Sequence, residues 1–166
     1  MTRIVGIDPG VEPAFALKDL KTGQIEFFDD GFNVVKRGKK AHKEPNVALL
    51  AHRLRTWGPD IVILEHVNPI SGQGLASTGT FMRAFGQLEG LIVGLGFPYQ
   101  LVRPQQWQRD LRVKSGHDEA RAKVLQWYPG LASELSRKKD HNRAAALLLA
   151  IWGEKIALRD HPLFVD

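Results

Sequence analysis

Two short apolar segments, each ending in a carboxylate, constrain the fold of this chain most strongly. Residues 3–8 are β-branched and apolar, and they end at Asp8 before the turn-forming pair Pro9-Gly10. Residues 61–64 are entirely apolar and end at Glu65. A strand without polar alternation is usually buried on both faces, as in an α/β sheet covered by helices on each side. The two segments therefore predict neighbouring strands of such a sheet.

The rest of the pattern completes an α/β fold with a five-stranded mixed sheet flanked by helices. Segments 14–17 and 24–28 flank the turn-forming residues 21–23, which predicts an antiparallel meander of the first three strands. We expect a basic loop after that meander, followed by a helix that Asn46 caps and that runs to about Trp57. After the strand at 61–65 we expect a loop over 67–80, a helix over 81–95, a strand over 98–102, and helices beyond Pro104, the last from Arg143 to about Leu158.

Composition limits the classes of protein that fit. The chain has 166 residues, the size of one domain, and we expect a single domain over residues 1–166. Because it has no cysteine, any metal must be bound by oxygen or imidazole ligands. No apolar run reaches the ~18 to 20 residues that cross a bilayer, so we expect a cytoplasmic protein with no membrane partner. The net charge of +5 weakly favours a polyanionic partner.

Asp8 and Glu65 are the first candidates for chemistry. Adjacent parallel strands would bring both carboxylates to one edge of the sheet, where open α/β sheets bind their ligands. Two close carboxylates repel each other unless a divalent cation such as Mg²⁺ neutralises them. Taken singly, Asp8 is better explained as a turn residue and Glu65 as a solvated strand end, and only the third block reverses this preference. The polar segment 138–143 before the apolar run 144–150 predicts a buried helix whose first turn lies at the same edge.

These three blocks resemble the metal-site motifs of RuvC-type Holliday junction resolvases, particularly phage and chloroplast-like members. The similarity extends over nearly the whole chain. It implies an RNase H-like nuclease domain with strand order 3-2-1-4-5. It also implies a homodimer that nicks four-way DNA junctions symmetrically, with two Mg²⁺ or Mn²⁺ ions bridged by Asp8 and held by Glu65 and residues of the last helix.

The same resemblance assigns two further ligands to the last helix. His141 matches the first of them, with Asp140 as a close competitor that is equally well explained as the helix N-cap. The second, an Asp or Glu in the family, falls on Ala145, which cannot bind a metal. Either this chain is naturally degenerate or Ala145 is a deliberate inactivating substitution, and the intact remaining blocks favour the second explanation. The resemblance then implies a chain that binds junctions and cuts them poorly.

Basic and glycine-rich segments are the candidates for DNA contact, although charge runs are often only solvated surface. The loop 68–80 follows Glu65 where RuvC-type enzymes probe the junction centre, and its glycines allow close approach to DNA. The first basic cluster comprises Lys36, Arg37, Lys39, Lys40 and Lys43, a possible extension comprises Arg83, Arg103, Arg112, Lys114, Arg121 and Lys123, and the loop contributes Asn68, Ser71, Gly72 and Gln73.

The helix over 81–95 is the candidate dimer interface, because Gly86, Gly90 and Gly94 recur every four residues and permit close helix approach. The same ridge could equally pack on the chain's own sheet. We assign Phe81, Met82 and the tryptophans Trp107, Trp127 and Trp152 to structural roles. Two other functions stay open: another RNase H-like nuclease, or a branched-DNA-binding protein without catalysis.

Overall fold

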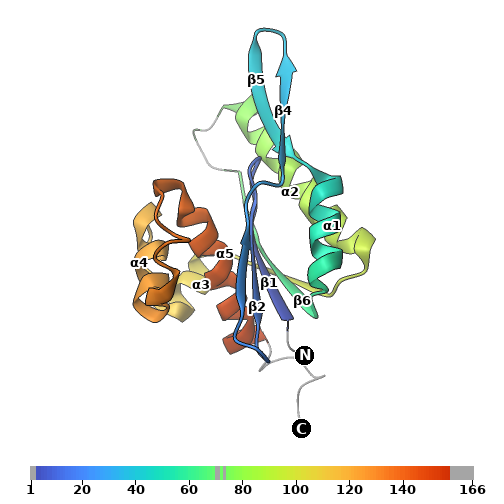
Figure 1. The fold of residues 1–166 in the computed structure, drawn as a ribbon. Helices are drawn as coiled ribbons and strands as arrows, with labels where there is room; N and C mark the ends of the chain where they lie inside the picture. The colour runs from blue at the N-terminus through green and yellow to red at the C-terminus, as the bar shows by residue number, and fades with distance from the viewer. Residues whose placement is uncertain (1–2, 70–71, 73, 158–166) are drawn as a thin grey trace.

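The computed structural model describes residues 3–69, 72 and 74–157 and has a mixed five-stranded sheet at its centre (Figure 1). The strands are β1 (Arg3–Asp8), β2 (Ala14–Asp19), β3 (Ile25–Phe28), β6 (Ile61–Glu65) and β7 (Tyr99–Val102). Their order is β3-β2-β1-β6-β7. Since β4 and β5 form a separate hairpin, this order is the predicted 3-2-1-4-5, and the predicted fold class is confirmed.

The strand register brings the two candidate carboxylates to the same edge. β1 is antiparallel to β2 and parallel to β6, with Ile7 opposite Leu64. Asp8 and Glu65 are the next residues of the two strands, so they lie side by side at the carboxyl ends. β7 continues the sheet in parallel beyond β6.

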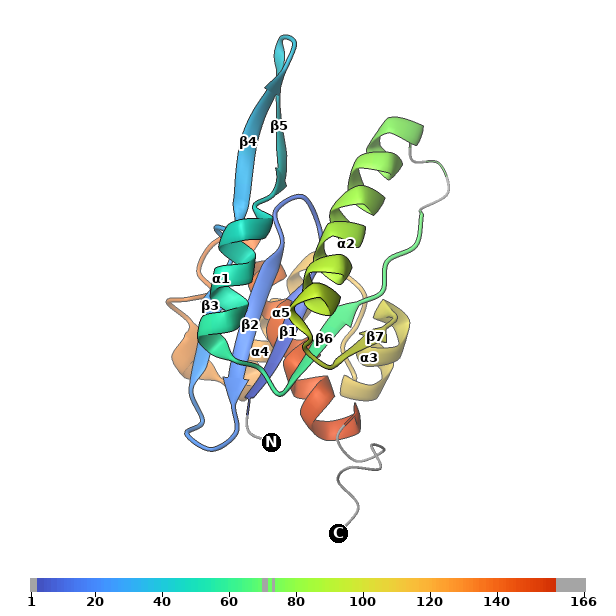
Figure 2. The same cartoon turned by 90° about the vertical axis from the view of Figure 1, so that its right-hand side faces the viewer.

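Helices cover both faces of the sheet (Figures 1 and 2). One face carries α1 (Val47–Trp57) and α2 (Leu75–Leu95). The other carries α3 (Pro104–Leu111), α4 (His117–Trp127) and α5 (His141–Trp152). Side-chain alternation along β1 sends Val5 and Ile7 into the first layer and Ile4 into the second. Short 3-10 turns at Pro129–Leu131 and Lys138–Asp140 and a π turn at Gly153–Ala157 complete the described elements.

Helix α5 lies directly against the backbone of β1. A Cβ atom at Gly6 would lie 1.9 Å from the carbonyl oxygen of Ala146, so only glycine permits this approach. Directly after the end of α5, a Cβ at Gly153 would lie 3.2 Å from Cγ2 of Ile4. Because α5 passes Gly6 at Ala146 and the chain reaches Ile4 only at Gly153, α5 runs antiparallel to β1. Its first turn is therefore at the end of β1 that carries Asp8.

The predicted basic loop is wrong: residues 32–45 form a hairpin of β4 (Phe32–Arg37) and β5 (Lys40–Pro45). Gly38 provides its tight turn with a φ of +65°. The hairpin extends away from the sheet (Figure 2). Basic residues at 36, 37, 39 and 40 follow the β-branched pair Val34-Val35, and they mask the alternation that marks a strand.

Two helix boundaries also differ from the prediction. α2 begins at Leu75, so residues 75–80 of the predicted loop are helical, and Thr80 donates its hydroxyl to the Ala76 carbonyl at 2.9 Å. Extending an established helix through small polar residues is much easier than starting one, which explains the early start. α5 begins at His141 rather than Arg143 and changes to the π turn after Trp152. The helix that Asn46 caps is confirmed, with its side chain accepting from the Leu49 amide at 3.0 Å.

Candidate active site

Asp8 and Glu65 direct their side chains to the α5 side of the sheet. Along β1, Asp8 alternates with the buried Ile7 and shares a face with Gly6, against which α5 packs. Along β6, Glu65 shares a face with Ile63, whose side chain packs in the core beneath α5. The two carboxylates therefore lie together on one face and at one edge of the sheet, next to the first turn of α5.

Burial and mutual repulsion disfavour the doubly ionised form of this pair. Burial and the negative charge of Glu65 raise the pKa of Asp8 well above its usual value. Burial also raises the pKa of Glu65, and a hydrogen bond from Trp107 opposes that shift. Within residues 3–69, 72 and 74–157, neither carboxylate forms an ion pair with Lys, Arg or His. A divalent cation would relieve the repulsion, and oxygen donors are what Mg²⁺ and Mn²⁺ prefer.

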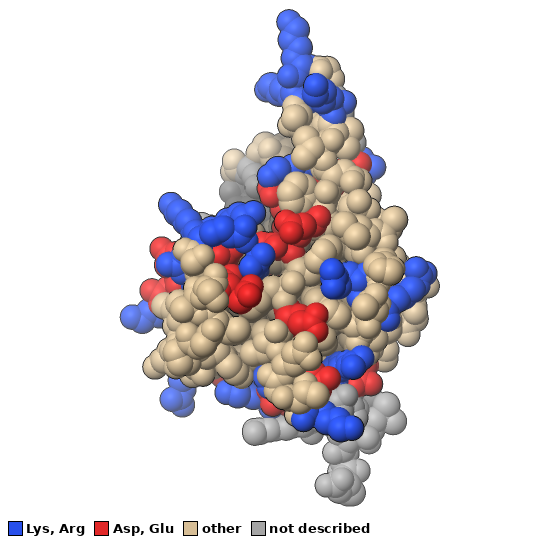
Figure 3. Space-filling model, in the orientation of Figure 1, with Lys and Arg blue, Asp and Glu red and all other residues tan. Residues whose placement is uncertain are grey.

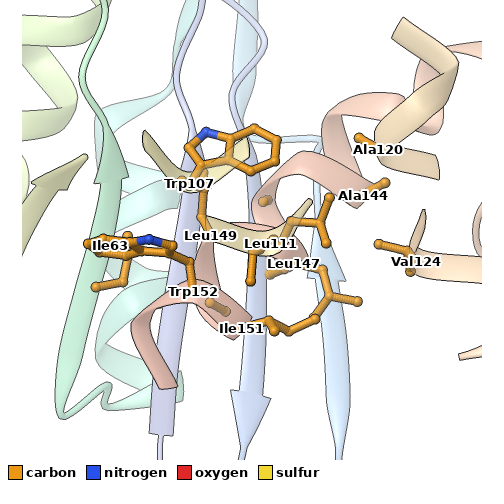
Figure 4. Packing of buried hydrophobic residues seen from close by; sticks show 14 of the residues in the cluster. Ile63, Trp107, Leu111, Ala120, Val124, Ala144, Leu147, Leu149, Ile151 and Trp152 are labelled. Atoms are coloured by element: carbon orange, nitrogen blue, oxygen red, sulfur yellow. The ribbon is translucent and has the colours of Figure 1, made fainter. Parts of the chain in front are cut away.

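Trp107 contacts this pair directly. It lies in α3, which follows β7 at the same edge of the sheet, and its Nε1 donates to Oε1 of Glu65 at 2.8 Å. The ring is buried in the core beneath α5, as the structural assignment of Trp107 predicted (Figure 4). The sequence analysis missed the hydrogen bond. Its one signal was the position of Trp107, one turn into a helix that begins with Pro104 just after a strand.

Asp140 is engaged within its own segment. Its carboxylate is buried and accepts the Arg137 amide at 2.6 Å and the Arg137 Nε at 2.9 Å. Burial acts to raise the pKa of Asp140, but the hydrogen bonds and charge of Arg137 outweigh it and the pKa is lowered. Asp140 occupies the N-cap position of α5, as the alternative interpretation predicted, yet its side chain makes no capping bond to that helix. The oxygens of Asp140 are thus already used.

His141 and Ala145 lie one turn apart on α5, at the end nearest Asp8. The Nδ1 atom of His141 is 3.0 Å from the carbonyl oxygen of Lys138, on the preceding turn. Ala145 is half-buried. Among the residues that the structure describes, no three His, Asp or Glu side chains gather closely enough to hold one metal ion. The structure brings Asp8 and Glu65 together, and the ligand roles of Asp140 and His141 stay predictions.

An ion-pair network fixes the first turn of α5. Arg143 donates from Nε and Nη2 to the two oxygens of Asp29, at 2.9 and 2.7 Å. Arg137 reaches the same carboxylate, with Nη2 at 3.3 Å from Oδ2. Asp29 follows β3 and leads into the hairpin, so the network joins the start of α5 to the base of the hairpin.

The hairpin lysines and Arg83 are the candidate DNA-binding residues nearest this edge of the sheet. Figure 3 shows Lys and Arg side chains at the tip of the hairpin. Lys36, Lys39 and Lys40 are exposed, and Lys43 forms an ion pair with Glu12 at 2.7 Å. At the hairpin base, a cavity of about 280 Å³ is lined by His42, Lys43, Arg83 and residues of the early part of α2.

The other predicted contacts lie on separate surfaces or outside the described residues. Arg103, at the start of α3, and Asn68 are exposed, and Gly72 has a left-handed φ of +87°. Ser71 and Gln73 lie outside the described residues, as does the side chain of Arg37. Arg112, Lys114 and Lys123 line a different groove, between α3 and α4, and Arg121 donates to the Arg137 carbonyl at 3.2 Å.

The glycine ridge of α2 does not pack on the chain's own sheet. A Cβ atom at Gly86, Gly90 or Gly94 would meet no atom within 4 Å. The three glycines line an open groove of about 420 Å³ between α1 and α2. Met82 packs against the core, in line with its assignment to structure, and Phe81 is half-buried. The ridge is therefore accessible to another helix.

The strand order and the helices on both faces of the sheet are those of the RNase H-like fold. Among solved structures, the chain is similar to T. thermophilus RuvC in complex with a Holliday junction substrate. The TM-score is 0.62 and the identity 15%, over 96% of this chain and 97% of that one. A second T. thermophilus RuvC structure gives a TM-score of 0.52 and 14% identity, over 93% and 96% of the two chains. The predicted RuvC-like fold is thereby confirmed.

A curated relative shares sequence with half of the chain. It is the chloroplastic Holliday junction resolvase MOC1 of Chlamydomonas reinhardtii, 33% identical over 85 residues, which make up 50% of this chain and 10% of that protein. No protein-family model matches. The described residues contain no helix long and apolar enough to cross a membrane.

Proposed function

We propose that this chain is a Holliday junction resolvase, a metal-dependent endonuclease that nicks four-way DNA junctions symmetrically. The observation that carries the proposal is the pair Asp8 and Glu65, two carboxylates without a cationic partner on adjacent strand ends of a RuvC-like fold. Similarity to a curated Holliday junction resolvase over 85 residues supports the same substrate class. As the sequence predicted, we treat residues 1–166 as one nuclease domain of a cytoplasmic protein.

Asp8 and Glu65 would hold the divalent cation, either Mg²⁺ or Mn²⁺. Their raised pKa values fit this role, because a cation stabilises the ionised pair that burial and repulsion disfavour. Ions held there would supply an activated water for attack on a phosphodiester and would stabilise charge on the departing oxygen. The chain's own contribution is to fix the two carboxylates on neighbouring strands and to cover them from the α5 side.

The donors expected from α5 are incomplete. Ala145 offers no oxygen, and the carboxylate of Asp140 is already used by Arg137. We therefore propose that the chain with Ala145 binds junctions and cuts them poorly, and that Ala145 replaces an acidic ligand. His141, one turn earlier on α5, is the proposed partner of that acid.

The hairpin and the start of α2 form the proposed DNA-binding surface. Phe28 at the end of β3 pairs with Phe15, which pairs with Ile7, so the hairpin grows from the same sheet edge as Asp8. Exposed lysines on the hairpin and Arg83 on α2 surround the cavity at its base. Such a surface suits phosphate contacts on both sides of a branch point. Along the chain, the segment that contains Asn68 connects Glu65 to the start of α2.

A homodimer follows from the symmetry of the substrate. A four-way junction has approximate two-fold symmetry, and paired nicks require two active sites related by such an axis. We propose that the glycine ridge of α2 forms the interface, because Gly86, Gly90 and Gly94 are open and lie beside the apolar Leu91 and Leu95. Small residues at this spacing let two helix backbones come close.

The second candidate is a branched-DNA-binding protein without catalysis. The absence of an acid at 145 and the engagement of Asp140 favour it. The two candidates differ in one expected result. If the rest of the catalytic site has also been lost, supplying an acid at position 145 will not produce cleavage.

The experiment compares three labelled substrates: an immobile four-way junction, a matched duplex and an RNA–DNA hybrid. Binding is measured with the chain as it stands, and cleavage with the Ala145→Asp variant in Mg²⁺ and in Mn²⁺. Selective junction binding together with paired, symmetric nicks supports the resolvase. Equal affinity for duplex, or preferential cutting of the hybrid, overturns the junction assignment and leaves another RNase H-like nuclease.

A further inference from the structure

Three buried tryptophans donate their indole N–H to a carboxylate. The pairs are Trp57 with Glu26 at 3.0 Å, Trp107 with Glu65 at 2.8 Å, and Trp152 with Asp110 at 3.0 Å. Of these three acceptors, only Glu65 belongs to the candidate active site. We propose that Trp107 is a positioning residue, which holds the Glu65 carboxylate in the orientation that binds the cation shared with Asp8. This inference rests on the proposed function.

A neutral donor suits this task better than a charged one. A lysine or arginine paired with Glu65 would cancel the charge that attracts a divalent cation and would compete with it for both oxygens. The indole N–H occupies a single direction at Oε1 and leaves Oε2 without a protein donor among the described contacts. Glu65 thus keeps its negative charge, while its side chain loses the freedom to rotate away.

The donor itself is rigidly held. Trp107 is 3% exposed and packs in the core beneath α5 (Figure 4). Pro104 starts α3 immediately after β7, which fixes where the helix leaves the sheet. One turn after Trp107 on the same helix, Asp110 accepts the indole N–H of the fully buried Trp152.

Helix α3 therefore connects the two elements that carry the candidate ligands. Through Trp107 it contacts Glu65 on β6, and through Asp110 it contacts Trp152 at the end of α5. The partners that orient metal ligands set metal affinity because a ligand free to rotate must be ordered when the ion binds. Removing the Trp107 N–H should therefore weaken metal binding even though Trp107 touches no metal.

The test compares Trp107→Phe with Trp57→Phe. Each substitution removes one buried indole N–H that binds a carboxylate and keeps an aromatic ring in the core, and Trp57 is also 3% exposed. Mn²⁺ affinity is measured by titration calorimetry in the chain and in the Ala145→Asp background. We expect Trp107→Phe to lower the affinity about 10-fold to 100-fold and Trp57→Phe to leave it unchanged. Equal Mn²⁺ affinity in both variants overturns the inference.

A second measurement needs no substitution at Trp107. With ¹⁵N-labelled indoles, the chain gives four indole signals, one for each tryptophan, and the Trp57→Phe, Trp127→Phe and Trp152→Phe variants assign them. Titration with Mg²⁺ should move the Trp107 signal and leave the Trp57 signal in place. An unmoved Trp107 signal at Mg²⁺ concentrations where calorimetry detects binding overturns the inference, whatever the stability of the variants.

The two proposals fail in different ways. If neither the chain nor Ala145→Asp binds Mn²⁺ or Mg²⁺, the metal centre fails and the role of Trp107 fails with it. If both bind the ions and the Ala145→Asp variant cuts junctions, but Trp107→Phe behaves as Trp57→Phe does, the resolvase stands and only the positioning role of Trp107 is overturned.

Discussion

Arg143 in the first turn of α5 and Asp29 at the base of the hairpin form a two-point ion pair. The guanidinium atoms Nε and Nη2 lie 2.9 and 2.7 Å from the two carboxylate oxygens, and both side chains are mostly buried. A bidentate pair fixes orientation as well as distance. The ion pair therefore joins the first turn of α5, which carries His141, to the base of the hairpin that we propose binds DNA.

Replacing Asp29 with asparagine should lower the free energy of unfolding by about 2 kcal/mol, because Arg143 loses a charged hydrogen-bond partner. Burial acts to raise the pKa of Asp29, but Arg143 and Arg137 outweigh it and the pKa is lowered. The stabilisation is therefore present above the ordinary pKa of a carboxyl group and is lost as pH falls through the lowered pKa. Urea denaturation across the acidic range measures both effects. Asp30→Asn, at the exposed neighbouring residue, is the control and should change little.

Supplying an acid at position 145 should restore junction cleavage. We expect Ala145→Asp to raise the rate of nicking in Mg²⁺ by at least about 100-fold. Loss of a residue that only orients a metal ligand costs up to about that much, and a direct ligand should contribute more. Ala145→Asn has nearly the same shape without the charge and is the matched control. Nicking of a labelled four-way junction under single-turnover conditions measures the rate. Equal rates for the Asp and Asn variants would show that position 145 is not the missing ligand.

The carboxylate pair should make stability depend on pH and on divalent ions. Because the pKa values of Asp8 and Glu65 are raised in the folded chain, their contribution is fully present below the ordinary carboxyl pKa and is lost as pH rises through the raised values. Without divalent ions, Asp8→Asn should therefore stabilise the chain at about pH 8 and have a smaller effect at about pH 5. Thermal unfolding at both pH values measures this. If Asp8→Asn changed the stability equally at both pH values, the chain would not be destabilised by ionisation of this pair.

Magnesium should stabilise the ionised form of the site, and Asp8→Asn should abolish that response. An ion that binds only the folded chain stabilises it by about 2.7 kcal/mol at 100 times its dissociation constant. The Ala145→Asp variant should therefore gain stability from Mg²⁺ at about pH 8 and less at about pH 5, where protonation competes with the ion. Adding Asp8→Asn to that variant tests whether the gain comes from this site.

The hairpin lysines should contribute to the salt dependence of junction binding. Each lysine that neutralises one phosphate contributes about 0.9 to the slope of log affinity against log salt concentration. Lys39→Ala and Lys40→Ala should each reduce the slope by about that amount and weaken binding. Lys21, exposed in the turn after β2 at the opposite edge of the sheet, is the control. Unchanged slopes for both hairpin variants would remove the hairpin from the binding surface.

A larger residue in the glycine ridge should weaken self-association without unfolding the chain. A Cβ at Gly90 meets no atom of its own chain within 4 Å, and alanine favours a helix over glycine by about 1 kcal/mol. Gly90→Leu should therefore fold well and dissociate a dimer that uses the α2 ridge. Analytical ultracentrifugation measures the association, with Gly79→Leu, in an open position of α2 outside the groove, as the control. A dimer that persists in Gly90→Leu would place the interface elsewhere.

The sequence was sufficient to predict the sheet and its paired carboxylates. Strands such as 61–65 are apolar throughout and end abruptly at a charged residue, so local pattern and tertiary burial agree. The hairpin was missed because its lysines interrupt the alternation that reveals a strand, and its stability comes from cross-strand pairing that no single segment displays. The early start of α2 has a local cause instead, because residues 75–80 extend a helix that the following residues establish.

The contacts around the candidate ligands could not be predicted from the chain alone. Glu65 and Trp107 are 42 residues apart, and Asp29 and Arg143 are 114 apart. Trp107 carried no pattern that distinguished a packed ring from one that also binds a carboxylate. Asp140 was ambiguous because the same residue type caps helices and binds metals, and its engagement by Arg137 depends on the turn that precedes α5.

The contact of α5 with Gly6 makes the distance between helix and strand a property of the main chain. Gly6 has no side chain, and a Cβ there would lie 1.9 Å from the Ala146 carbonyl oxygen, so main-chain contact sets the separation at this point. The reach from position 145 to the proposed cation site at Asp8 and Glu65 then depends mainly on the length of the side chain at 145. Aspartate and glutamate differ by one methylene in length. The fixed distance between α5 and β1 should therefore favour one of these two acids at position 145.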